Sequence, residues 1–463
     1  MMMRLAEAVR YMHDSQCVGD DRVACERIVT DSRAVRAGDL FVALKGERFD
    51  AHDFLPDVVR QGAAAVVVER LPQDLAVPAA LVPDTRIALG ELAAGWRRRF
   101  VLPVVAVTGS NGKTTVKEMI STIFARAVGE SHRLATAGNF NNDIGVPLTL
   151  FGLNAQHRLA VLELGMNHPG ETAYLAAIAQ PTIALINNAQ REHQEFMVDV
   201  AAVAQEHLSV VLALPADGTA VFPADSEFAP LWRAAAAQRR IFDFALDAPA
   251  VVSGRYDAAT RALRATTPAG DIALNLPVLG EHNARNALAA MACALAAGVT
   301  PDAIAYALSR FGAVKGRLQI TTLTRGALAG TTLVDDTYNA NPDSVRAAID
   351  VLAAMPGPRA LILGDMGEVG DQGPEFHREA GAYAHARGIE VLLATGDLAR
   401  HACEAFGAGA HHFADVGALN AHVQSAVRPL ASVLVKGSRF MRMERVVGAL
   451  ENSYGAIEQQ RNS

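Results

Sequence analysis

A glycine-rich turn between an apolar run and a helical segment carries the strongest chemical signal in the sequence. The stretch VVAVTGSNGKTTVKEM starts at Val104, and its polar turn consists of Gly109, Ser110, Asn111, Gly112, Lys113, Thr114 and Thr115. Glycines let the backbone bring N–H groups close to a phosphate, and the following helix N-terminus favours an anion. Lys113 would reach the β- and γ-phosphates of a nucleotide, and the Thr114 hydroxyl would face Mg²⁺. Because Val107 replaces the first glycine of the usual G-x-x-x-x-G-K-[ST] pattern, we expect a shortened phosphate loop.

Further polar residues follow other apolar runs. Glu163 ends RLAVLEL, where its carboxylate would either bind Mg²⁺ as a hard oxygen ligand or make a local hydrogen bond. His193 lies in AQREHQEF, just past another run, and a lone histidine in such a loop is more often solvated than bound to a metal. Asn283 and Asn286 stand three residues apart at a helix start and share one face. Their amides would either contact an adenine edge or cap the helix.

The apolar runs that position these residues predict an α/β protein of three domains. Residues 1–100 contain short runs such as DLFVALKG and AAAVVVE, which indicate a small α/β domain. Residues 101–313 alternate strand, loop and helix around VVAVTG, RLAVLELG and TIALINNA, which is typical of a P-loop-type domain with a mainly parallel sheet. Residues 314–463 repeat the pattern with TTLVDDTYN, RALILGDM, IEVLLATGD and ASVLVKGS, which predicts a Rossmann-like doubly wound domain. Polar residues gather at the strand ends of both later domains, so we expect an active site between two facing sheet edges.

Composition narrows the class of protein. The net charge of −7 argues against a nucleic-acid partner, which would call for a basic face. The apolar run ALAAMACALAAGV is too short to span a bilayer, and the N-terminal stretch MMMRLAEAVRYMHD has no signal-peptide pattern, so we expect no membrane insertion. The four cysteines form no CxxC pair, which favours a reducing compartment and a cytoplasmic location.

The phosphate turn, together with a set of motifs along the chain, resembles the Mur ligases and their relative folylpolyglutamate synthase. These enzymes share a G-[ST]-N-G-K-T loop, here TGSNGKTT. The other motifs occur in the family's order over essentially the whole chain: DSRAVRAGDLFVALKGERFDAHDF, GNFNNDIGVPLTL, LELGMN, GEHNARNALAA, VKGR, DDTYNANPDS, GDMGEVG and VKGS. The resemblance implies an ATP- and Mg²⁺-dependent ligase of cytoplasmic peptidoglycan precursor synthesis. It would join UDP-N-acetylmuramoyl-tripeptide to D-alanyl-D-alanine through an acyl phosphate, and we expect a monomer.

Two other functions stay open. The preceding ligase of the family adds a diamino acid and carries a D-N-P-R-type motif, whereas this chain reads YNANPDS with no arginine before Arg346. That difference favours the dipeptide-adding enzyme. A non-catalytic nucleotide-dependent switch would need only the loop, and the polar strand ends of both later domains favour chemistry instead.

The resemblance also implies roles for individual residues. Nucleotide contacts would come from the phosphate loop, with Asn283 near the adenine, Arg317 at the γ-phosphate and Asp336 near the ribose. Thr114, Glu163 and His193 would bind metal, and Lys113, Glu163 and His193 would be catalytic. Ser32 and Lys45 would contact the uridine nucleotide, although this chain has Asp50-Ala51-His52 where the family has Asp-Gly-His. Thr136, Asn139 and Asn142 would meet the muramoyl-peptide, and the amine substrate would meet Tyr338, Asn339, Asn341, Lys436 and Ser438.

One position departs from the family in a way that affects catalysis. Mur ligases carry a lysine fourteen residues after the metal-binding histidine, and CO₂ converts this lysine to an anionic carbamate. Counting from His193 gives His207, and no lysine occurs between Lys117 and Lys315. A neutral imidazole supplies no negative charge, and Mg²⁺ prefers oxygen ligands. We therefore expect His207 to act by hydrogen bonding, through a metal-bound water, with a carboxylate such as Glu163 supplying the charge. Activity should then be indifferent to bicarbonate, and it should fall at acid pH if His207 must be neutral.

Overall fold

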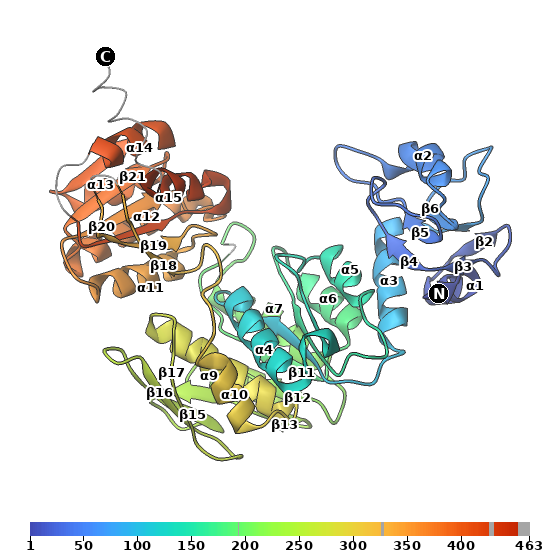
Figure 1. The fold of residues 1–463 in the computed structure, drawn as a ribbon, viewed down its shortest axis with the longest axis horizontal. Helices are drawn as coiled ribbons and strands as arrows, with labels where there is room; N and C mark the ends of the chain where they lie inside the picture. The colour runs from blue at the N-terminus through green and yellow to red at the C-terminus, as the bar shows by residue number, and fades with distance from the viewer. Residues whose placement is uncertain (193, 326–327, 426–429, 452–463) are drawn as a thin grey trace.

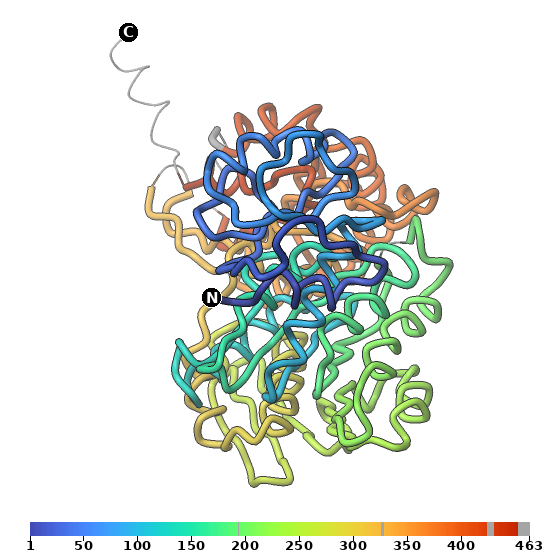
Figure 2. The backbone as a smooth tube through the Cα atoms, turned by 90° about the vertical axis from the view of Figure 1, so that its right-hand side faces the viewer, coloured from blue at the N-terminus to red at the C-terminus, as the bar shows by residue number. Residues whose placement is uncertain are grey.

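The chain folds into an N-terminal, a central and a C-terminal lobe. The computed structural model describes residues 1–463 except 193, 326–327, 426–429 and 452–463. In Figure 1 the N-terminal lobe (blue) and the C-terminal lobe (orange to red) stand apart above the central lobe. The view at 90° in Figure 2 brings the N-terminal lobe in front of the C-terminal one, with the central lobe again below both.

The N-terminal lobe is built on a five-stranded sheet with the strand order β2-β7-β6-β5-β4. Its strands are β2 (Gln16–Val18), β4 (Arg27–Val29), β5 (Asp39–Val42), β6 (Ala65–Val68) and β7 (Ala79–Leu81), beside the small pair β1 (Met3–Arg4) and β3 (Ala24–Cys25). The helices are α1 (Leu5–Tyr11), α2 (Leu55–Arg60) and α3 (Thr85–Arg97). Leu89, Leu92 and Trp96 of α3 belong to one hydrophobic core with residues of both the first sheet and the central sheet. The helix therefore joins the first two lobes.

The central lobe contains the predicted parallel sheet. Its order is β13-β12-β11-β8-β10-β9, and every neighbouring pair is parallel. The strands are β8 (Val104–Thr108), β9 (Arg133–Ala135), β10 (Leu159–Glu163), β11 (Ile183–Ile186), β12 (Thr219–Val221) and β13 (Arg240–Ile241). The helices are α4 (Lys113–Val128), α5 (Gly145–Leu150), α6 (Glu171–Ala179), α7 (Val200–Leu212), α8 (Ala229–Ala235), α9 (Glu281–Ala296) and α10 (Pro301–Leu308). Val105 and Val107 of β8 belong to one core cluster, while Val104 and Ala106 belong to the other, so this strand is buried on both faces.

A four-stranded sheet between β13 and α9 is an addition that the strand, loop and helix pattern did not predict. It consists of β14 (Phe244–Leu246), β15 (Val252–Asp257), β16 (Ala262–Thr266) and β17 (Ile272–Asn275), with the last three antiparallel. Leu263 and Ala265 face the core, whereas Arg264 between them is exposed, as expected of a sheet with one solvated face.

The C-terminal lobe is doubly wound as predicted, with an antiparallel edge strand. Its order is β18-β19-β23-β20-β21-β22, and only the β18–β19 pair of this described sheet is antiparallel. The strands are β18 (Gln319–Thr322), β19 (Thr332–Asp336), β20 (Arg359–Gly364), β21 (Val391–Thr395), β22 (Ala410–Phe413) and β23 (Ser432–Lys436). The helices are α11 (Pro342–Ala353), α12 (Gly373–Ala386), α13 (Ala399–Phe406), α14 (Val416–Ser425) and α15 (Glu444–Glu451).

In the part of the chain that the structure describes, none of the helices has the length and apolar character needed to span a bilayer.

An arginine of the central lobe clasps two helices of the C-terminal lobe. Arg191 follows β11, and its guanidinium donates to Asp343 on α11 at 2.7 Å and to Glu379 on α12 at 2.7 Å. Its backbone N–H also donates to Asp343 at 2.8 Å. The hydrogen bond from Arg191 lowers the pKa of Glu379. These contacts are partly shielded from water and use the planar fork of arginine, so they restrain the angle between the lobes.

Removal of the Arg191 side chain should loosen the contact between the central and C-terminal lobes. We expect Arg191→Ala to raise the radius of gyration measured by small-angle X-ray scattering, because hydrogen bonds between charged groups contribute about 1.5–3 kcal/mol each. Arg191→Lys should recover only part of the compactness, since one ammonium cannot serve two carboxylates as a fork does. The matched control is Arg387→Ala, which breaks the Arg387–Asp350 ion pair within the C-terminal lobe. An unchanged radius for Arg191→Ala would show that other contacts hold the lobes.

Candidate active site

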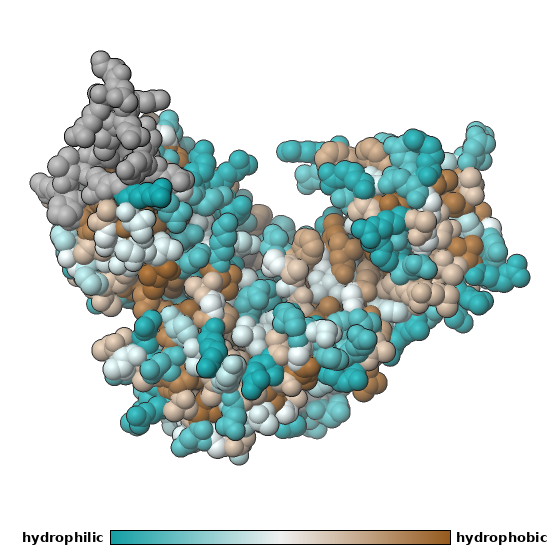
Figure 3. Space-filling view, in the orientation of Figure 1, coloured by the Kyte–Doolittle hydropathy of each residue, from teal (hydrophilic) through white to brown (hydrophobic). Residues whose placement is uncertain are grey.

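A cleft of about 1500 Å³ lies where the central and C-terminal lobes meet. Its walls include the phosphate turn, the residues that follow β10 and β11, the start of α9 and the residues that follow β19, β20 and β23. Figure 3 shows the hollow between the lobes, with hydrophilic side chains along its rim. The cleft therefore lies beyond the carboxyl ends of two parallel sheets, where open α/β folds bind ligands.

The phosphate turn adopts the close approach that its glycines permit. Gly109 has φ +132°, and a Cβ there would meet the Asn187 side chain at 2.9 Å. Gly112 has φ +79° and precedes α4, and a Cβ there would meet the Asn286 Oδ1 at 2.6 Å. Both positions are thus restricted to glycine by conformation and by space. The turn presents the N-terminus of α4 to the cleft, which suits a phosphate.

The Glu163 carboxylate is placed to hold a cation beside this turn. It ends β10 and is buried, and its Oε1 accepts from the Thr114 hydroxyl at 3.1 Å and from Asn141 at 2.8 Å. Its Oε2 is buried and finds no hydrogen-bond partner among the described residues. An orphaned carboxylate oxygen next to a hydroxyl fits Mg²⁺, which takes oxygen ligands. Arg317 reaches the same hydroxyl from the start of the C-terminal lobe at 2.9 Å. His193, the third predicted ligand, lies outside the described residues.

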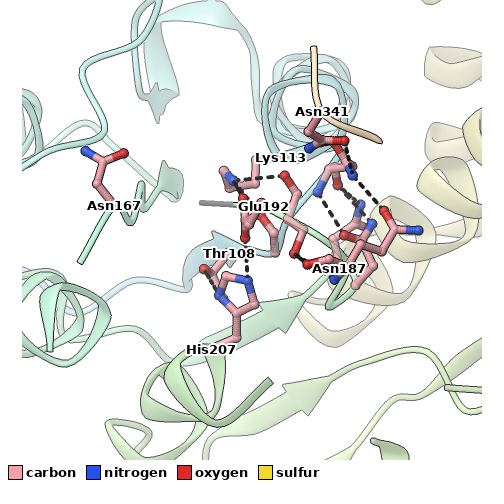
Figure 4. A network of polar contacts seen from close by, with 12 residues as sticks. Thr108, Lys113, Asn167, Asn187, Glu192, His207 and Asn341 are labelled. Carbon is pink, nitrogen blue, oxygen red and sulfur yellow. Dashed lines mark hydrogen bonds and ion pairs between the residues drawn. The ribbon is translucent and has the colours of Figure 1, made fainter. Parts of the chain in front are cut away.

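The structure gives His207 two buried contacts, one to a hydroxyl and one to a carboxylate. His207 is fully buried on α7, its Nδ1 lies 2.9 Å from the Thr108 hydroxyl, and its Nε2 lies 3.0 Å from Glu192 Oε1. The other oxygen of Glu192 lies 3.4 Å from the Lys113 ammonium, as Figure 4 shows. The carboxylate that His207 contacts is therefore Glu192 and not Glu163. Glu206, the residue before His207 in the helix, points elsewhere and accepts from the backbone N–H groups of Gly170 and Thr172.

An amide network ties the start of α9 to the phosphate turn. Asn187 donates to the Asn111 carbonyl at 2.8 Å and to Asn286 Oδ1 at 2.9 Å. Asn286 in turn donates to Asn283 at 3.1 Å, which confirms that the two asparagines share a face. Asn283 also donates to the Leu279 carbonyl at 2.7 Å. Asn283 lines the cleft, as a residue near a nucleotide base should.

The residues predicted to meet the amine substrate hydrogen-bond to one another and to neighbouring residues. The Lys436 ammonium lies 2.6 Å from Asp336 and 2.9 Å from the Asn339 carbonyl. Asn341 caps α11 and donates to Asn111 Oδ1 at 2.9 Å, which places a residue of the C-terminal lobe against the phosphate turn. Ser438 accepts from the Gly367 N–H at 2.7 Å and donates to the Ala340 carbonyl at 3.0 Å. Asp336 therefore has a lysine as its partner in this structure.

The remaining predicted residues fall into separate places. Asn139 and Asn142 line the cleft, and Tyr338 lies under the Arg317 guanidinium at 4.3 Å. Thr136 does not line it as predicted, because its side chain is buried and accepts from the Glu163 N–H at 3.0 Å.

In the N-terminal lobe, Ser32 is half-buried and Lys45 is exposed, and neither belongs to the cleft wall. Ala51 has no left-handed φ, so alanine replaces the family's glycine there without strain.

Sequence reasoning expected polar residues at the strand ends but gave no individual role to those that support the phosphate turn. Asn188 Oδ1 accepts from the Asn111 N–H at 2.8 Å, and Gln190 Oε1 accepts from the Asn111 amide at 2.7 Å. Asn141 and Glu192 were missed as well. The available signal was the run NNAQRE directly after a buried strand, because side chains at that place point to the ligand edge of the sheet.

The chain is similar to known protein families and to named proteins over most of its length. Family descriptions match in the order "Mur ligase family, catalytic domain" over 25–97, "Mur ligase middle domain" over 107–294 and "Mur ligase, glutamate ligase domain" over 316–439. The UDP-N-acetylmuramoyl-tripeptide–D-alanyl-D-alanine ligase of Escherichia coli is 40% identical over 93% of this chain and 95% of that protein. Its counterpart in Haemophilus influenzae is 40% identical over 95% of this chain and 96% of that protein.

Solved structures agree with these matches. A crystal structure of MurF from Acinetobacter baumannii superposes with a TM-score of 0.88 at 34% identity, covering 97% of this chain and 98% of that one. MurF from Thermotoga maritima in complex with ADP superposes with a TM-score of 0.84 at 26% identity, covering 96% and 100%. The three family matches cover most of the chain, and they include the phosphate turn and the residues around the cleft. This chain therefore belongs to the Mur ligase family.

Proposed function

We propose that this protein is the ATP-dependent ligase that joins D-alanyl-D-alanine to UDP-N-acetylmuramoyl-tripeptide in peptidoglycan precursor synthesis. The observation that carries the proposal is the cleft itself, where a phosphate turn on one sheet faces the DDTYNANPDS and VKGS segments at the strand ends of another. Relatives at 40% identity over nearly their whole length bear the name of this activity.

The reaction has two steps that this geometry suits. A carboxylate oxygen of the tripeptide attacks the γ-phosphorus of ATP, the bond to the bridging oxygen breaks, and ADP leaves with the electron pair. The amine nitrogen of the dipeptide then attacks the acyl carbon, the carbon–oxygen bond breaks, and phosphate leaves as the amine loses a proton. Both steps gather negative charge, so cationic groups fixed in the cleft should supply much of the rate enhancement.

The residues are assigned as follows within the proposal. Lys113 and the N-terminus of α4 bind the phosphates, and Arg317 adds a second cation beside Thr114. Thr114, Glu163 and His193 would hold Mg²⁺, which neutralises phosphate charge when bound. Asn283 lies on the nucleotide side and Asn139 with Asn142 on the tripeptide side. Partly buried Tyr174 also lines the tripeptide side, and burial raises its pKa to about 12, so its phenol stays a hydrogen-bond donor at neutral pH.

The domain assignment and the setting are part of the same proposal. Residues 1–100 would bind the uridine nucleotide through Ser32 and Lys45, residues 101–313 would bind ATP, and residues 314–463 would bind the amine. A cytoplasmic location is supported by four cysteines that are all free thiols. We also propose that the enzyme is a monomer.

The rival diamino-acid activity is disfavoured by the position of Arg346. That arginine stacks on Tyr383 at 3.9 Å and pairs with Glu379 at 3.3 Å. It does not line the cleft, so it offers no guanidinium to a free carboxylate there.

Lys113 should be essential for turnover and dispensable for folding. We expect Lys113→Ala to lower the ligation rate by about 10²–10³, because one lost charge contact at a transferring phosphoryl group has that effect. The variant should still fold, although with a lower melting temperature, because Glu192 loses a cationic partner but keeps its hydrogen bond to His207. Arg255→Ala, at an exposed position of β15, is the control for loss of one positive charge. Near-parental turnover by folded Lys113→Ala would exclude the assigned role.

The amine substrate should be the dipeptide. With ATP and the matching UDP-linked tripeptide or dipeptide, we expect faster amide formation with D-alanyl-D-alanine than with meso-diaminopimelate, because the segment YNANPDS carries no arginine and Arg346, which follows it, lies outside the cleft wall. Phosphate release should require both co-substrates, as measured by a coupled assay and by mass spectrometry of the product. Faster ligation of the diamino acid would establish the rival activity, and phosphate release without an amine would indicate a nucleotide-dependent switch.

A further inference from the structure

We propose that Glu192 and His207 form a positioning pair for Lys113, with Glu192 as the fixed anion of the nucleotide site. The inference rests on the function proposed above and adds two residues to its machinery. It starts from an uncommon arrangement, a buried carboxylate and a fully buried histidine directly behind a phosphate turn.

The chain of contacts runs in one direction, from the sheet to the phosphate site. Thr108 ends β8, and its hydroxyl lies 2.9 Å from His207 Nδ1. An ionised carboxylate can only accept, so the Nε2–H of His207 donates to Glu192 Oε1 at 3.0 Å. Thr108 then donates to Nδ1, which fixes the ring in one tautomer. His207 therefore holds one oxygen of Glu192 and leaves the other directed at Lys113.

Lys113 is held on its own turn by this carboxylate. Its ammonium donates to the Gly109 carbonyl at 2.5 Å and the Ser110 carbonyl at 3.2 Å, and Glu192 Oε2 lies 3.4 Å away. The lysine has little exposed surface, and Glu192 has less. A buried charge is tolerated only when it is paired and hydrogen-bonded. Glu192 thus sets where the positive charge of Lys113 lies before a phosphate arrives.

The charge of Glu192 has two opposite effects, because it weakens nucleotide binding and favours turnover. It repels the phosphate groups, which weakens binding, and this repulsion is strong where water is excluded. It also fixes the ammonium in direction, which favours the step in which charge develops on the transferring phosphoryl group. Removing the charge while keeping the shape should therefore tighten nucleotide binding and slow turnover. A side chain that only supports the fold would not separate these two quantities.

The pair also accounts for the histidine at position 207. From the Cα of that position, an imidazole followed by a hydrogen bond of 3.0 Å reaches a carboxylate at a distance of about 7–8 Å at standard bond lengths. A lysine at this position with a carboxyl group on its side-chain nitrogen would place that carboxyl at about the same distance from the Cα. In this chain a built-in carboxylate can thus stand where a lysine-borne one would, without any need for CO₂.

The test measures ADP affinity by calorimetry in EDTA, together with the kcat of ligation, on the full chain. We expect Glu192→Gln to bind metal-free ADP about tenfold more tightly because a repelling charge is lost. Its kcat should fall about 10- to 100-fold because the ammonium is no longer directed. Glu404→Gln removes the carboxylate of another histidine–glutamate pair, away from the cleft, and should change neither quantity.

His207 is tested by two variants, one that keeps a hydrogen-bond donor and one that removes it. His207→Gln keeps a donor for Glu192 and should retain most of the parental kcat, whereas His207→Leu should lose about tenfold or more, since a misplaced group can cost up to 10² in rate. In a Lys113→Ala background, Glu192→Gln should have no further effect on kcat, because it acts through that lysine. Added bicarbonate should change none of these rates.

Several results would overturn the inference, and the first three concern affinity and rate. They are parental ADP affinity and kcat in Glu192→Gln, parental kcat in His207→Leu, and additive losses in the Lys113→Ala/Glu192→Gln double variant. Weaker ADP binding with a lowered melting temperature in Glu192→Gln would show a purely structural role and would overturn it as well. If ADP binding does not depend on Lys113 at all, the proposed function itself fails. If it does depend on Lys113 but not on Glu192, only this inference fails.

Discussion

The segment from residue 187 to residue 192 must bind the phosphate turn and the C-terminal lobe at the same time. Asn187 and Asn188 bond the Asn111 backbone, Arg191 clasps α11 and α12, and Glu192 reaches Lys113. Because these residues follow one another directly after β11, a movement of the C-terminal lobe would also move the residues that hold the phosphate turn. This coupling gives the cleft its shape. In the proposed reaction, groups on two sheets must act in a common geometry, and rigid elements joined by a short segment can provide it.

Much of the fold could be predicted because buried parallel strands read as continuous apolar runs. VVAVTG, RLAVLELG and TIALINNA became the adjacent strands β8, β10 and β11, and the runs of the C-terminal half became β19, β20, β21 and β23. The four-stranded sheet was missed because buried and exposed residues alternate along β15 to β17, which is a weaker signal than a continuous apolar run. The antiparallel edge strand β18 was missed for the same reason, since half its residues are exposed.

In the candidate site, residues of a local motif could be predicted from the sequence, and residues brought together by tertiary packing could not. Residues inside a strong local motif, such as Lys113 and Thr114, could be identified from spacing, because strand, glycine turn and helix lie together in the sequence. Glu192 could not, because its role depends on His207 being brought beneath it by the packing of α7 on the sheet, and no local pattern encodes that. Thr136 shows the reverse case. It lies in a motif typical of the family, yet the fold buries it behind Glu163, where its hydroxyl accepts a hydrogen bond from the Glu163 backbone N–H.

The account holds that the tripeptide carboxylate attacks the γ-phosphate in this cleft before the amine arrives. The most direct measurement is the transfer of oxygen from the substrate. The terminal carboxylate of the UDP-linked tripeptide is labelled with ¹⁸O, ligation is run with ATP and D-alanyl-D-alanine, and the released phosphate is analysed by mass spectrometry. The account predicts one ¹⁸O atom in each phosphate formed per amide bond, because the carboxylate oxygen leaves with phosphorus. Phosphate that carries no label, with amide formed at the normal rate, would contradict it.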